Sequence, residues 1–130
     1  MSSVFDESAI IRLLAADERV ESAYLLGSAA QGRLRPDSDV DIALMSAKGK
    51  SLNAVERCLL AASLSLELGR EVELGLLSSA NLVYARQAIL TGHRLFAHDS
   101  FRADLRAASL LGMYERFNLD RREVSDAYSA

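Results

Sequence analysis

Two aspartates separated by a single residue, Asp39 and Asp41, are the side chains of this sequence whose type and spacing best suit metal chemistry. At positions i and i+2 of a strand, both carboxylates point to one face, with their Cα atoms ~6–7 Å apart. The two charges repel each other, so one carboxylate takes up a proton unless a cation lies between them. Mg²⁺, a hard ion that prefers oxygen ligands, is the natural cation. A pair of such ions holds both the attacking and the leaving oxygen of a phosphoryl displacement.

A third carboxylate completes a site of this kind, and Glu73 is the best candidate for it. It lies in the strictly alternating segment EVELGLL (71–77), in which Val72 and Leu74 face the opposite side. Glu73 reaches the aspartate pair if its strand lies beside the strand that Asp39 begins. An Asp-x-Asp pair alone is more often a solvated strand start, and it is the combination of residues that points to metal.

A glycine and a serine, Gly27 and Ser28, stand where an apolar strand ends, and ten residues separate them from Asp39. At the start of a short helical turn, free backbone N–H groups bind phosphate oxygens, and the serine adds a hydroxyl donor. Glycine also lets the backbone approach a ligand closely. A phosphate site and an acidic metal site therefore face each other across one loop, as a nucleoside triphosphate requires. The sequence holds neither a G-x-x-x-x-G-K-[ST] nor a G-x-G-x-x-G motif.

The apolar pattern predicts the elements that must position these residues. We expect an α/β (α+β) fold, with a small mixed β-sheet flanked by helices. The predicted strands are 20–26, 39–45, 71–77 and 93–97, and the predicted helices are 6–16, 51–68, 78–90 and 99–117, with a loop over 27–38.

The helix predicted over 51–68 has an apolar stripe at spacings of three and four residues. We expect this stripe to face the core and Ser51 to cap the helix. The single cysteine, Cys58, is expected to be a small core residue. The stripe consists of Leu52, Val55, Leu59, Ala62 and Leu66.

Composition excludes several classes of protein. The chain has 130 residues, half of them apolar, with 15 basic and 18 acidic side chains. This length suits one domain, which we expect over 1–117, followed by a polar C-terminal extension over 118–130. The acidic balance argues against binding of a long nucleic acid. The sequence shows no signal-peptide layout and no apolar run that spans a membrane, so the expected location is cytoplasmic.

The string GSAAQGRLRPDSDVDIAL resembles the signature of the DNA polymerase β-type nucleotidyltransferase superfamily. Within that superfamily it is similar to the minimal nucleotidyltransferase (MNT) branch, the antitoxins that pair with HEPN toxins. The likeness extends over about residues 5–115. It implies the nucleotidyltransferase fold and the transfer of AMP from ATP to an acceptor hydroxyl, with release of pyrophosphate.

The resemblance also implies roles for the five residues. Gly27 and Ser28 hold the triphosphate, while Asp39 and Asp41 bind Mg²⁺ and, through it, the nucleotide. Glu73 completes the metal site and helps to deprotonate the acceptor. The family often has aspartate at this third place, so the glutamate here reaches further by one methylene.

In MNT–HEPN pairs the acceptor is a tyrosine of the toxin, a small helical RNase, and AMPylation blocks that RNase. The resemblance thus implies a protein adenylyltransferase that acts as an antitoxin in a hetero-oligomer with its toxin. A chain of 130 residues has little room for a second substrate-binding domain, which agrees with a protein acceptor. Two alternatives stay open: an antitoxin that neutralises by binding alone, and an aminoglycoside-type small-molecule nucleotidyltransferase completed by a partner subunit.

Overall fold

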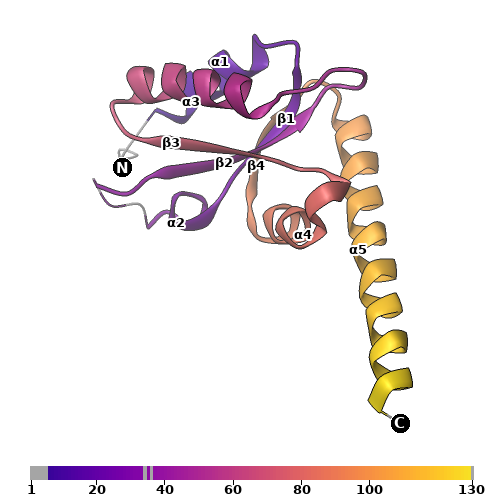
Figure 1. Cartoon of the computed structure of the whole chain (residues 1–130). Helices are drawn as coiled ribbons and strands as arrows, with labels where there is room; N and C mark the ends of the chain where they lie inside the picture. Colours follow the sequence, from indigo (N-terminus) through magenta and orange to yellow (C-terminus); the bar gives the residue numbers. More distant parts are fainter. Residues whose placement is uncertain (1–5, 34, 36, 130) are drawn as a thin grey trace.

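A four-stranded mixed sheet lies between two layers of helices in the computed structural model, which describes residues 6–33, 35 and 37–129 (Figure 1). The predicted α/β class and the predicted order of elements are confirmed. Positions 34 and 36 of the predicted loop lie outside the described residues. The elements are α1 (Glu7–Ala15), β1 (Val20–Leu25), α2 (Gly27–Ala30), β2 (Val40–Ser46), α3 (Ala54–Leu68), β3 (Val72–Leu76), the 3-10 turn η1 (Ser79–Asn81), α4 (Leu82–Thr91), β4 (His93–Ala97) and α5 (Ser100–Ser129).

The strands lie in the order β3-β2-β1-β4. Strand β1 is antiparallel to β2, which follows it in the chain, and to β4, which comes last of the four strands. Strand β3 is parallel to β2, because helix α3 carries the chain back across the sheet between them. The register pairs Asp41 with Glu73, so the predicted neighbourhood of these strands is confirmed.

Strand β2 lies inside the sheet, and both of its faces are covered. Ile42 and Leu44 belong to the core beneath α1 and α3. Ala43 and Met45 belong to the core beneath α4 and α5. Asp41 has the same parity as Ala43 and Met45, so it lies on the α4 side of the sheet, just beyond the apolar core.

Leu52, just before helix α3, is buried as predicted, but the helix itself turns the opposite face to the core from the one predicted. Val55, Leu59 and Leu66 are 67%, 66% and 87% exposed, whereas Leu64 is fully buried. Cys58 is exposed as well, so its prediction as a core residue is wrong. The helix carries a second apolar stripe on its other side, and this stripe packs on the sheet through Leu60, Leu64 and Leu68.

The start of α3 also differs from the prediction. Asn53 caps it rather than Ser51, and the cap is reciprocal. The Asn53 side chain accepts from the Glu56 N–H, and the Glu56 side chain accepts from the Asn53 N–H, each at 2.8 Å. This capping box stabilises the helix start, which a single serine hydroxyl does less well.

Helix α5 is 30 residues long and passes through position 117 without a break. Its first half packs against α4 and the sheet, and its second half projects away from the other elements (Figure 1). Arg106 anchors the first half by an ion pair with Glu21, a buried carboxylate of β1, at 2.5 Å. In the described part of the chain, no helix has the length and apolarity needed to cross a membrane.

Candidate active site

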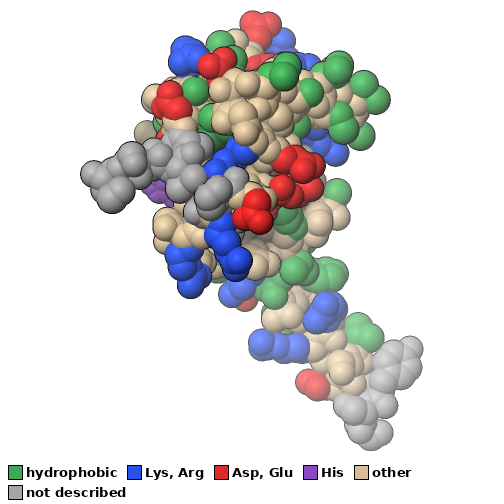
Figure 2. Space-filling view, turned by 90° about the vertical axis from the view of Figure 1, so that its left-hand side faces the viewer, with side chains coloured by type: hydrophobic (Ala, Val, Ile, Leu, Met, Phe, Trp, Pro, Cys, Tyr) green, Lys and Arg blue, Asp and Glu red, His purple; other side chains and the backbone are tan. Residues whose placement is uncertain are grey.

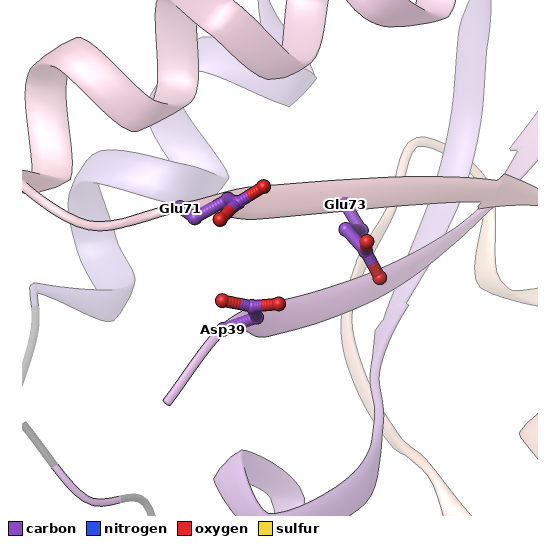
Figure 3. A group of neighbouring side chains, drawn as sticks. All are labelled: Asp39, Glu71 and Glu73. Carbon is purple, nitrogen blue, oxygen red and sulfur yellow. The ribbon is translucent and has the colours of Figure 1, made fainter. Parts of the chain in front are cut away.

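Four carboxylates gather where β2 and β3 begin. Asp41 and Glu73 lie side by side on neighbouring strands. Asp39 stands just before β2, and Glu71 just before β3. One carboxylate oxygen each of Asp39, Glu71 and Glu73 lies within 4.8 Å of the other two (Figure 3). The structure thus brings together the three carboxylates predicted from the sequence and adds a fourth.

The carboxylates repel one another, and Glu73 shows the effect. A hydrogen bond with Asp41 raises the pKa of Glu73, and the charges of Asp41 and Asp39 raise it further. A cation placed among these carboxylates would offset their negative charge. Several oxygen ligands within a few ångströms of one another suit a hard divalent cation such as Mg²⁺.

Sequence reasoning missed Glu71 as a site residue. Its signal was present, because Glu71 and Glu73 are two residues apart in an alternating strand and must share a face. The two pairs occupy equivalent positions on the parallel strands. Asp39 precedes β2 and Asp41 lies within it, just as Glu71 precedes β3 and Glu73 lies within it.

Gly27 and Ser28 open helix α2 directly after β1. Gly27 has φ +61°, a left-handed conformation that favours glycine. A Cβ at this position would lie 3.8 Å from Asp41 Oδ2, so the turn and the carboxylate are in direct proximity. The first backbone bond of α2 runs from the Ala30 N–H to the Leu26 carbonyl, at 3.4 Å. The amides of Gly27 and Ser28 therefore have no acceptor within the helix.

A shallow cleft of about 690 Å³ lies beside the start of α2. Its charged lining consists of two arginines, Arg33 and Arg35, which suit an anionic ligand, and one carboxylate, Asp37. Arg70 holds the far end of this loop, because its guanidinium donates to the carbonyls of Arg35 and Ser38, each at 2.9 Å. Figure 2 shows acidic and basic side chains gathered next to each other on this side of the molecule.

A second cleft, of about 860 Å³, begins at Asp41 and Glu73 and follows β3. Tyr84 of α4 lines it and packs against Gly75 of β3. Burial raises the pKa of the Tyr84 hydroxyl, and the charges of Asp41 and Glu73 raise it further. The sequence predicts Tyr84 as a core residue, and it does pack against the core beneath α4, but no local pattern ties a residue of α4 to β3 and the site.

Comparison with known proteins gives a consistent result. Residues 8–101 match the family model described as "Polymerase beta, Nucleotidyltransferase". The chain is 31% identical over 122 residues to the protein adenylyltransferase MntA of Shewanella oneidensis, covering 93% of this chain and 86% of that protein.

Two solved structures of toxin–antitoxin complexes contain chains that are similar to this one in sequence and fold. A toxin–antitoxin crystal structure with AMP-PNP holds a chain that is 30% identical to this one, with a TM-score of 0.79 over 96% of this chain and 99% of that chain. The structure of a tri-AMPylated HEPN toxin from Shewanella oneidensis in complex with an MNT antitoxin holds a chain that is 28% identical to this one. The TM-score is 0.73, over 95% of this chain and 96% of that chain.

Proposed function

The chain belongs to the polymerase β-type nucleotidyltransferase family, and we propose that it transfers AMP from ATP to a tyrosine hydroxyl of a HEPN-type RNase toxin, whose antitoxin it is. The observation that carries this proposal is that two different half-sites, the phosphate-binding start of α2 and the carboxylate cluster of β2 and β3, adjoin each other. The amide-bearing start of α2 adjoins Asp41, and Asp41 adjoins Glu73. A triphosphate bound at α2 thus has its reacting phosphorus beside the carboxylates.

The donor set fits a divalent cation, as the raised pKa of Glu73 and the converging carboxylate oxygens indicate. In the proposed site Asp39, Asp41 and Glu73 would hold Mg²⁺, as two ions, and Glu71 stands close enough to contribute an oxygen. When bound, Mg²⁺ supplies the positive charge that offsets the triphosphate and the carboxylates.

The protein's own groups then have separate tasks. The Gly27 and Ser28 amides and the Ser28 hydroxyl hold phosphate oxygens, which orients ATP. The acceptor oxygen forms a bond to the α-phosphorus, the bond from this phosphorus to the bridging oxygen breaks, and pyrophosphate leaves. Glu73, which lies beside Asp41 on the neighbouring strand, takes the acceptor proton.

The protein acceptor follows from the relatives. MntA is named as a protein adenylyltransferase, and one of the matched structures holds a tri-AMPylated HEPN toxin in complex with an MNT antitoxin. For this chain we therefore infer a hetero-oligomer with a helical RNase, located in the cytoplasm. AMP added to such an RNase places a bulky anion where RNA must bind.

A transfer assay with labelled ATP tests the proposal. The full chain, its cognate HEPN-type partner, ATP labelled at the α-phosphate and Mg²⁺ are expected to yield labelled partner. Asp39→Ala with Asp41→Ala is expected to abolish labelling while the fold persists, because the removed charges repel one another. The matched control, Glu18→Ala with Asp120→Ala, removes two exposed carboxylates elsewhere and is expected to keep activity. Unchanged labelling by the Asp39/Asp41 variant would contradict the proposal.

A further inference from the structure

Strand β3 forms one edge of the sheet, and half of its backbone groups point outward. The Val40 N–H donates to the Glu71 carbonyl, and the Leu77 N–H donates to the Leu44 carbonyl. In a parallel ladder the partner strand uses alternate residues, so residues 71, 73, 75 and 77 bond to β2. The N–H and C=O groups of residues 72, 74 and 76 therefore face away from β2.

One of these outward donors is already occupied within the protein. The Val72 N–H donates to Ser65 Oγ of α3 at 3.0 Å, which confirms the direction deduced from the ladder. The next two outward positions, Leu74 and Leu76, line the 860 Å³ cleft. The strand edge in this cleft thus offers a donor and an acceptor at each of two positions, spaced for pairing with another strand.

The spatial order of the phosphate-binding turn, Asp41 and Glu73 determines which reactant lies next to the β3 edge. The start of α2 adjoins Asp41 on β2, and Asp41 adjoins Glu73 on β3, the edge strand. The pyrophosphate leaves on the α2 side, because α2 holds the phosphates. In phosphoryl transfer the attacking and leaving oxygens lie roughly in line across the phosphorus. The acceptor hydroxyl must therefore come from the β3 side.

We propose that the acceptor protein binds as an added strand, laying an extended, tyrosine-bearing segment along the β3 edge with the tyrosine opposite Glu73. This inference rests on the proposed function and specifies how its acceptor is recognised. Residues directly opposite each other on neighbouring strands share a face, with Cβ atoms ~4.5–5.5 Å apart. A tyrosine opposite Glu73 thus lies on the carboxylate face, and backbone bonds to Leu74 and Leu76 fix its position.

The same register predicts which residues flank the acceptor tyrosine. Its sequence neighbours point to the other face of the sheet, toward helix α3. There the cleft is lined by Ala54, Cys58 and Ala61, which are small, and by Arg57. Small apolar residues, or an acidic residue within reach of Arg57, are therefore expected next to the acceptor tyrosine.

Amide hydrogen exchange tests the inference without requiring turnover. In the free chain the Leu74 and Leu76 amides are expected to exchange faster than the Glu73 and Gly75 amides, which bond to β2. In complex with the cognate HEPN-type partner and α,β-methylene ATP, whose α–β bridge is not cleaved, the Leu74 and Leu76 amides are expected to slow by at least tenfold. Equal exchange in the free chain and the complex would overturn the added strand, and failure to form any complex would overturn the proposed function with it.

A proline substitution tests the same bond during catalysis. Leu76→Pro removes an outward N–H and leaves the ladder to β2 intact, whereas Leu76→Ala shortens the same side chain but keeps the N–H. Loss of one such bond is expected to lower kcat/KM for the partner about tenfold in Leu76→Pro relative to Leu76→Ala. The KM for ATP is expected to be equal in both. Equal kcat/KM for the partner would overturn the inference, while transfer by Leu76→Ala would leave the proposed function standing.

Discussion

Substitution of Gly75 by alanine is expected to disturb the active-site cleft by a steric route. A Cβ at this position would come closest to the Tyr84 hydroxyl oxygen, and it would lie 2.7 Å from Cζ and 3.1 Å from Cε2 of the same ring. Carbon atoms pack best at ~3.5–4.0 Å, so the ring must move by up to about 1 Å. Gly75 does not have a positive φ, so alanine suits its backbone and the steric contact is the main cost. Forcing extra volume into a packed site costs ~1–3 kcal/mol.

A double-mutant cycle isolates this contact. In Gly75→Ala alone, the free energy of unfolding is expected to fall by ~1–3 kcal/mol. In the Tyr84→Ala background the same change meets open space and is expected to be neutral, or to stabilise by up to ~1 kcal/mol because it removes glycine's freedom in the unfolded chain. The coupling energy between the two substitutions is then ~1–3 kcal/mol.

Urea unfolding of the four proteins, followed by circular dichroism at neutral pH, measures the cycle. The m-value must stay constant for the comparison to report stability. A cost for Gly75→Ala that is the same with and without Tyr84 would refute the reasoning, because the loss would then come from the strand backbone. A stable Gly75→Ala protein in the Tyr84 background would refute it as well.

Further predictions concern charge and helix stability. Glu73→Gln is expected to raise the melting temperature in metal-free buffer at pH 7. The pKa of Glu73 is raised in the folded protein. The stability that this carboxyl group contributes is therefore lost as the pH rises from its ordinary pKa through the raised pKa. The variant therefore loses this part of the pH dependence, and thermal melts from pH 4 to 8 that match the wild type would contradict it. Among the described residues, Arg106→Leu leaves the buried Glu21 carboxylate with one ion pair, to Arg102 at 3.8 Å, and is expected to cost ~2–4 kcal/mol in urea unfolding. Adding Glu21→Leu is expected to recover most of that loss, and no recovery would exclude an unpaired charge as its cause. Gly112→Ala meets nothing within 4 Å on helix α5 and is expected to stabilise by ~0.5–1 kcal/mol, so a loss of stability there would contradict the open surface.

Much of the site followed from local pattern. Strict alternation placed Glu73 on one face of its strand, and the loop between Gly27 and Asp39 had to bring its two ends together because the flanking strands pair. The same alternation placed Glu71 beside Glu73, although only the register with β2 showed that Asp39 lies next to it. These features depend on a period of two residues, which a sequence displays directly.

The features that sequence reasoning missed depend on which surfaces meet. Helix α3 has apolar stripes on two opposite sides, so spacing alone did not show that Leu64 is buried and Leu59 exposed. The contact between Tyr84 and Gly75 joins α4 to β3 through tertiary packing, for which neither segment carries a local signal. Arg70 likewise holds a loop that lies 32 to 35 residues away.

Intact mass spectrometry of the partner tests the proposed activity most directly. The chain is incubated with its cognate HEPN-type partner, ATP and Mg²⁺, and the partner is then fragmented to locate any added group. AMP transfer predicts that the partner gains mass in whole AMP units on tyrosine, and that no gain occurs without ATP or with the Asp39→Ala/Asp41→Ala variant. A partner that forms the complex and keeps its mass unchanged would contradict the proposal that this chain is an adenylyltransferase of its toxin.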